Sequence, residues 1–170
     1  MTDLRYDTYC GLYCGACEIM AANTDEDKNR IINMWSSETW EATPEQLSCR
    51  GCKTDHPFIY CANCAMRQCA RSKGVEVCIQ CGEFPCVYYE QGRTAVEQIP
   101  NLKHMKAIIK NLRQIRDHGV EHWLANEKSK WECPQCKAPF TWYMEECRFC
   151  VKDLRGMKDY ETLTEEDVTF

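Results

Sequence analysis

The sequence predicts a small α+β protein stapled by metal ions, in which a mostly helical, cysteine-rich zinc module precedes a C-terminal β-hairpin zinc ribbon. Three features support this fold class. Fifteen of the 170 residues are cysteine, within the ~8–10% range that marks a scaffold built by sulfur. Many of these cysteines form Cys-x2-Cys pairs, a spacing typical of zinc sites. A cysteine-free stretch, 87–132, contains a helical repeat of apolar residues.

The thiols are expected to bind metal rather than one another. Their odd number leaves one over in any scheme made only of disulfides. The first ten residues, MTDLRYDTYC, carry charges and lack the apolar stretch of a secretory signal. No run approaches the ~18 apolar residues of a membrane span. We therefore expect a cytoplasmic protein without membrane contact, in a reducing compartment where thiols are more often metal ligands.

Composition divides the chain into four segments. No cysteine lies between Cys86 and Cys133, and the residues after Met157 are mostly acidic with little apolar content. Terminal segments of that kind are commonly mobile. The expected organisation is a cysteine-rich metal-binding module at 1–92, a helical connector at 93–130, a zinc ribbon at 131–154 and a flexible acidic tail at 155–170.

Four helices are predicted in chain order, at residues 18–40, 61–73, 102–117 and 120–130, and Thr24 could cap a break within the first. Gly74 follows the second, as glycine often does at a helix end. The third is the clearest, because apolar residues recur along it at intervals of three and four and so form one stripe. That stripe comprises Leu102, Met105, Ile108, Ile109, Leu112 and Ile115.

The predicted ribbon has two Cys-x2-Cys pairs separated by ten residues: Cys133 with Cys136, and Cys147 with Cys150. Four thiolates satisfy the tetrahedral preference of zinc, and a site of this type contributes roughly 10–16 kcal/mol of apparent binding energy. The intervening KAPFTWYMEE is rich in β-formers and predicts a hairpin. A rubredoxin-like iron site would have the same geometry. Zinc is the metal that we predict.

The eleven other cysteines precede residue 87. Four Cys-x2-Cys pairs could combine into two further four-thiolate sites, which gives about two to three zinc ions in the chain. The partition is not unique, and a [4Fe–4S] cluster would also take four cysteines. Cys10 is left open as a ligand. The predicted N-terminal ligands are Cys14, Cys17, Cys49, Cys52, Cys61, Cys64, Cys69, Cys78, Cys81 and Cys86.

The motifs CGLYCGAC, CRGC and CARSKGVEVCIQCGEFPC occur in this order over about residues 7 to 90. In this order they resemble an uncharacterised cysteine-rich prokaryotic family of unknown function. The resemblance implies a zinc-binding module and no established activity. Cys61 is extra to the family pattern, which makes Cys64, Cys69, Cys78 and Cys81 an alternative second site.

The spacing of Cys10, Cys14 and Cys17 also matches the cluster motif of radical S-adenosylmethionine enzymes. Those enzymes usually have an aromatic residue before the third cysteine, where this chain has Ala16. Their glycine-rich methionine-binding strand is missing from the sequence. At 170 residues the chain is also shorter than a barrel of roughly 250 residues. Radical chemistry is therefore disfavoured.

The sequence contains no Gly-x-Ser-x-Gly motif, phosphate loop or dinucleotide fingerprint. Sites made only of thiolates are usually closed to substrate. We therefore predict a non-catalytic zinc-binding adaptor or accessory protein that docks a protein partner. One alternative is an iron–sulfur or thiol-redox protein that serves an anaerobic enzyme system. Another is nucleic-acid binding through the ribbon, which a net charge of −5 does not favour.

Overall fold

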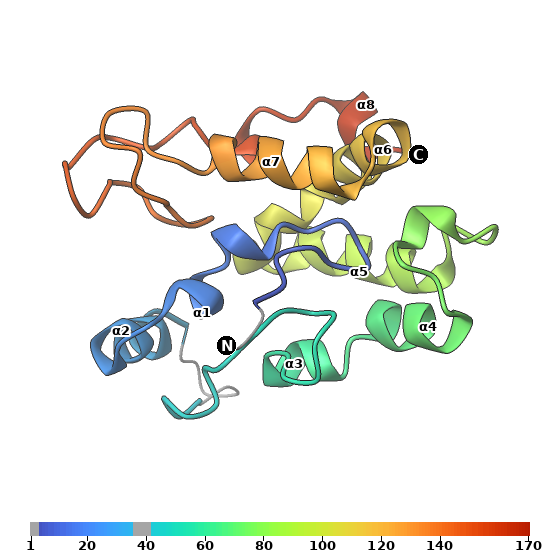
Figure 1. The fold of residues 1–170 in the computed structure, drawn as a ribbon, viewed down its shortest axis with the longest axis horizontal. Helices are drawn as coiled ribbons and strands as arrows, with labels where there is room; N and C mark the ends of the chain where they lie inside the picture. Colours follow the sequence, from blue (N-terminus) through green and yellow to red (C-terminus); the bar gives the residue numbers. More distant parts are fainter. Residues whose placement is uncertain (1–3, 36–41) are drawn as a thin grey trace.

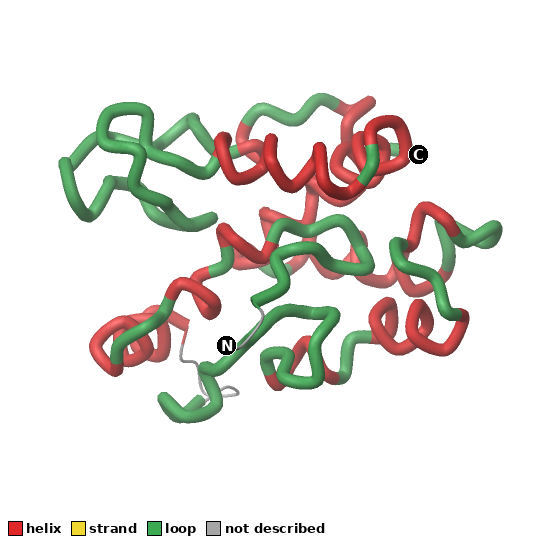
Figure 2. Tube along the Cα trace, in the orientation of Figure 1, coloured by secondary structure: helices red, strands yellow, loops and turns green. Residues whose placement is uncertain are grey.

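The computed structural model describes residues 4–35 and 42–170. Over these residues the chain folds into short helices joined by loops, and Figure 2 shows how evenly the two alternate. The α-helices, in part labelled in Figure 1, are α1 (Glu18–Ala21), α2 (Asp25–Trp35), α3 (Ile59–Ala62), α4 (Ala65–Lys73), α5 (Val87–Gln98), α6 (Ile108–His118), α7 (Val120–Lys130) and α8 (Glu165–Val168). The 3-10 helices are η1 (Cys14–Ala16), η2 (Cys78–Gln80), η3 (Pro100–Ala107) and η4 (Asp159–Glu161).

The predicted α+β class is wrong, because the described part of the chain is helical and contains no β-strand. Residues 131–154, expected to form a β-hairpin zinc ribbon, run as turns and loops. Two isolated antiparallel bridges remain there, Glu132 with Pro139 and Glu146 with Asp153. Each bridge closes the turn around one Cys-x2-Cys pair, so the backbone reverses before a strand can extend. The β-forming side chains between the pairs, Phe140 and Trp142, are buried in the core instead.

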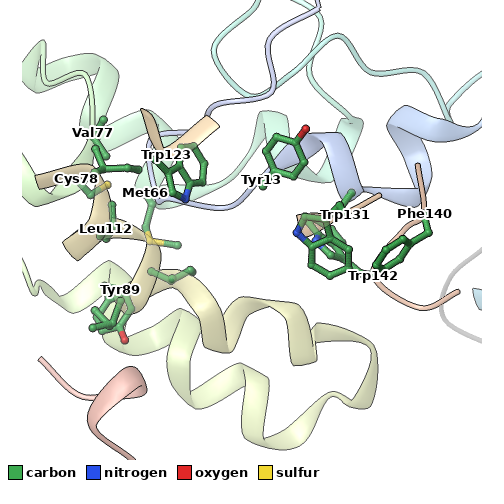
Figure 3. Close-up of a cluster of buried hydrophobic side chains, with 14 of the residues drawn as sticks. Tyr13, Met66, Val77, Cys78, Tyr89, Leu112, Trp123, Trp131, Phe140 and Trp142 are labelled. Carbon is green, nitrogen blue, oxygen red and sulfur yellow. The ribbon is translucent and has the colours of Figure 1, made fainter. Parts of the chain in front are cut away.

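The apolar stripe of α6 lies at the centre of the core, as its periodicity predicts. Ile109 and Leu112 are fully buried, and Trp123 of α7 is buried beside them. Figure 3 shows Leu112 and Trp123 on one side of the cluster and the aromatic rings of the C-terminal loops on the other. Complete burial of side chains of this size contributes roughly 1.5–3 kcal/mol each. A substantial apolar core therefore accompanies the cysteines.

The N-terminal segment packs directly on α6. The side-chain amide of Asn111 donates to the carbonyl of Gly11 at 2.9 Å. Gly11 has φ +86, and a Cβ built there would lie 2.9 Å from Leu112 Cγ. The first cysteine motif can approach the helix this closely because glycine occupies that position. In Figure 1 this blue segment runs across the middle of the molecule, below α6 and α7.

Three of the predicted helices are divided in the structure, the first of them at the break that Thr24 was expected to cap. The helix expected at 18–40 forms α1 and α2, with the Asp27 amide capped by Thr24 Oγ1 at 3.1 Å; residues 36–40 lie outside the described residues. The helix expected at 61–73 breaks before α4, which ends at Gly74 with φ +65, as predicted. The first half of 102–117 is the 3-10 helix η3, which begins at Pro100.

Residues 155–170 contain η4 and α8 and contact α6. Arg113 donates to the carbonyls of Glu166 and Thr169 at 2.8 Å each. The rings of Phe84 and Phe170 meet edge-on with their centroids 5.4 Å apart. None of the described helices has the length and apolar character required to cross a membrane.

Gly51 provides a test of how the N-terminus is attached. It has φ +117, and an added Cβ would lie 2.1 Å from the Arg5 carbonyl oxygen. We expect Gly51→Ala to destabilise the protein well beyond the about 1–2 kcal/mol of left-handed strain alone. Gly74→Ala is the matched control, because Gly74 has φ +65 with open space around it. Chemical unfolding of both variants measures the difference, and equal losses would contradict this close approach.

His104 gives the fold a specific acid sensitivity. Its ring stacks on Trp142 at 3.8 Å and is hydrogen-bonded to the Tyr143 hydroxyl, and burial lowers its pKa from 6.5 to about 3. The neutral ring thus stabilises the fold above pH 6.5. This stability falls by up to about 1.4 kcal/mol per pH unit as the pH drops from 6.5 towards 3. His104→Gln, which cannot titrate there, should flatten the unfolding free energy against pH; an unchanged slope would contradict this.

Candidate metal centre

Four thiols from the C-terminal loops converge on one point: Cys133, Cys136, Cys147 and Cys150. Their sulfur atoms all lie within 4.8 Å of one another. Cys133 Sγ is 3.5 Å from Cys150 Sγ, and Cys136 Sγ is 3.5 Å from Cys147 Sγ. Four thiolates at ~2.3 Å from a tetrahedral ion would be about 3.8 Å apart. The group could therefore hold a metal ion with little rearrangement.

The two turns that present these thiols have the same construction. The amide of Lys137 donates to the Cys133 carbonyl at 2.9 Å, and the amide of Val151 donates to the Cys147 carbonyl at 2.9 Å. Both donors have positive φ, 62° at Lys137 and 58° at Val151. The two cysteine pairs are thus displayed by near-identical backbone turns. This equivalence explains why each pair presents both of its thiols from a single turn.

Backbone amides favour the thiolate form of the buried cysteines. The N–H groups of Phe149 and Cys150 lower the pKa of the Cys147 thiol to about 6. At Cys133, burial acts to raise the pKa, but the N–H groups of Cys136 and Gln135 outweigh it and the pKa is lowered. Because the thiolate is the form that binds metal, the turns prepare these two cysteines for an ion. At Cys136 and Cys150 the backbone amides also act to lower the pKa, but burial and the hydrogen bonds of neighbouring thiols outweigh them and the pKa is raised instead.

The loop between the two cysteine pairs of the four-thiol group is hydrogen-bonded to the N-terminal segment. The Trp142 amide donates to the Ala16 carbonyl at 2.9 Å, and the Tyr143 amide donates to Glu18 Oε1 at 2.7 Å. Glu18 is buried, and burial raises its pKa. Sequence reasoning missed Glu18; its place directly after Cys17 was the available signal. These contacts hold the loops of the C-terminal centre against the first cysteine motif.

All four donors in this group are sulfur. A closed four-thiolate site has no open position for water or substrate. The arrangement can therefore hold an ion and rigidify the loops, but it provides no coordination site at which a substrate could be polarised. The expected chemistry of the group is structural.

The N-terminal cysteines are placed differently. Across residues 4–35 and 42–170, no other set of three or more ligand atoms meets the 4.8 Å limit. Burial raises the pKa of Cys14 well above its ordinary value, and the nearby thiols of Cys17, Cys52 and Cys49 raise it further. Cys49 Sγ accepts the amides of Gly51 at 3.3 Å and Phe58 at 3.2 Å. These four thiols therefore share one neighbourhood, although no three of their sulfur atoms lie within 4.8 Å of one another.

Of the remaining cysteines, four line one cavity and three do not. Cys69, Cys78, Cys81 and Cys86 line one cavity of about 780 Å³. Lys73 also lines this cavity, and its Nζ lies 3.7 Å from Cys81 Sγ. Sequence reasoning missed Lys73. The available signal was that Lys73 follows Cys69 by four residues on a helix, which places both on one face. Cys61 is exposed, and Cys64 is the N-cap residue of α4. Cys10 Sγ is 3.5 Å from Thr8 Oγ1.

Comparison with known proteins places the N-terminal segment in a family. The chain has no significant match among curated proteins or solved structures. One family model matches residues 6–91, a span that includes every cysteine before the connector and stops short of the C-terminal group. This confirms the resemblance expected from the cysteine motifs. Because the match covers half of the chain, the protein belongs to the DUF3795 family, described as a protein of unknown function.

Proposed function

We propose that the protein is a zinc-binding protein in which Cys133, Cys136, Cys147 and Cys150 hold one structural zinc ion. The convergence of four sulfur atoms within 4.8 Å carries this proposal. Zinc is the metal that closed four-thiolate sites bind most commonly, and it imposes no geometry beyond the tetrahedron that these thiols approach. Iron in the same geometry is the competing occupant, which metal analysis distinguishes.

The proposed role is that of a non-catalytic adaptor or accessory protein. A closed thiolate site supports structure rather than turnover. A protein partner is favoured by two apolar side chains on the turn that presents Cys147 and Cys150, because Phe149 is 76% exposed and Val151 is 71% exposed. Large exposed apolar groups on a rigid turn suit contact with another protein.

Native mass spectrometry of purified protein tests the zinc site directly. We expect Cys147→Ala to lose about one zinc ion relative to the wild type, and a Cys147→Ala, Cys150→Ala double variant to lose no more. The losses are not additive because both thiols serve one ion. Phe149→Ala is the matched control, since its exposed side chain is no ligand and its backbone amide is retained. Unchanged zinc content in the cysteine variants, or iron in place of zinc, would defeat the proposal.

Removal of the ion should loosen the C-terminal loops. After treatment with a chelator, we expect faster hydrogen exchange at the amides of Lys137 and Val151, whose hydrogen bonds close the two turns. Binding energies of roughly 10–16 kcal/mol are lost when such sites are emptied. Amides of α6 in the apolar core serve as the internal reference. Equal protection of Lys137 and Val151 before and after chelation would show that the ion does not stabilise the turns.

A further inference from the structure

The cavity of about 780 Å³ lies where α4, η2 and the start of α5 meet. In Figure 1 these green elements occupy the end of the molecule opposite the C-terminal loops. Cys69, Cys78, Cys81 and Cys86 all line this cavity, so it brings together four thiols from three elements. The proposed zinc ion at the C-terminal group does not involve any of these four residues.

Each thiol reaches the cavity from a well-defined backbone position. Cys69 lies on α4, and Cys86 is the N-cap residue of α5. Cys78 is the first residue of η2 and Cys81 is its C-cap; the Cys81 amide donates to the Cys78 carbonyl at 3.0 Å and closes this turn. Gly74, with its positive φ, reverses the chain between α4 and η2. The four positions are therefore set by helices and turns rather than by a loose loop.

The spacing of the cavity thiols is wider than that of the C-terminal group. A zinc ion draws its four thiolates to about 3.8 Å from one another. The C-terminal group satisfies this requirement, whereas no three of the four cavity sulfurs lie within 4.8 Å of one another. An occupant that contacts all four at this spacing must be larger than one ion. An iron–sulfur cluster has this property, because each thiolate binds a different iron atom.

The charge and walls of the cavity suit such an occupant. A four-iron cluster with four thiolates is an anion, and Lys73 supplies a cation 3.7 Å from Cys81 Sγ. The carboxylate of Glu83, which also lines the cavity, lies 2.7 Å from the same ammonium; it fixes the position of Lys73 beside the thiol and offsets part of its charge. Met66, Val75 and Phe84 contribute apolar walls. A fixed cation and a partly apolar enclosure both stabilise a buried cluster and tune its potential.

We propose that Cys69, Cys78, Cys81 and Cys86 ligate a four-iron, four-sulfide cluster in this cavity. Each thiol releases its proton when it binds iron. Lys73 acts as a positioning residue that offsets the negative charge of the cluster. The assignment does not depend on zinc at the C-terminal group, because the two sets of ligands are separate.

Anaerobic reconstitution of the full chain with ferrous iron and sulfide tests this assignment. We expect about four iron and four acid-labile sulfide per wild-type chain, with visible charge-transfer absorption. Cys81→Ala and Cys86→Ala should each lose the cluster. Cys61→Ala is the matched control, since Cys61 is exposed and does not line the cavity. Far-UV circular dichroism of each variant separates loss of ligand from loss of fold.

Lys73→Met gives a second readout that does not remove a ligand. Loss of the cation should shift the reduction potential to more negative values, because the added electron is then less stabilised. The cluster assignment would be overturned if the wild-type chain were colourless and bound a zinc ion that the Cys81→Ala variant does not bind. Iron that persists in both Cys81→Ala and Cys86→Ala would overturn these ligands. Zinc measured in the same samples reports on the C-terminal group, so failure of either assignment is recognised separately.

Discussion

The contact between α6 and the first cysteine motif is the constraint on which the rest of the structure depends. Gly11 leaves room for Leu112, and Asn111 donates to the Gly11 carbonyl across the same contact. The helix that carries these residues also supplies the centre of the apolar core. Loops with little regular structure are thereby arranged around one rigid element. The core thereby helps to set the positions of the thiols that these loops carry.

The features that depend on local sequence were predictable. The apolar stripe of α6 follows from its spacing, and the end of α4 follows from Gly74. The C-terminal thiol group also follows from spacing, since each Cys-x2-Cys pair needs one turn. The β-hairpin did not follow, because the β-forming character of Phe140 and Trp142 serves burial in the core rather than strand pairing. Propensity describes how a side chain fits a surface, and here tertiary packing decides the backbone.

The partition of the N-terminal thiols could not be predicted, because four similar pairs present the same local pattern. Their partners are chosen by how distant segments pack. Cys69 and Cys86 meet across one cavity because α4, η2 and α5 pack together, and spacing alone does not report that arrangement. The importance of Glu18 likewise depends on a C-terminal segment that folds back onto it. Long-range contacts of this kind leave only indirect traces in a single sequence.

The residues that pack around the first cysteine motif extend beyond the residues that match the family model. Residues 6–91 contain all of the N-terminal thiols, yet Leu112 and Trp123, which shield the first motif from water, lie beyond that span. An excised matching segment would therefore present its inner apolar surface to solvent. The matched segment is thus shorter than the stretch of chain needed to bury its apolar side chains. In this chain, the helix that covers the first cysteine motif at Gly11 is supplied by residues outside the matched segment.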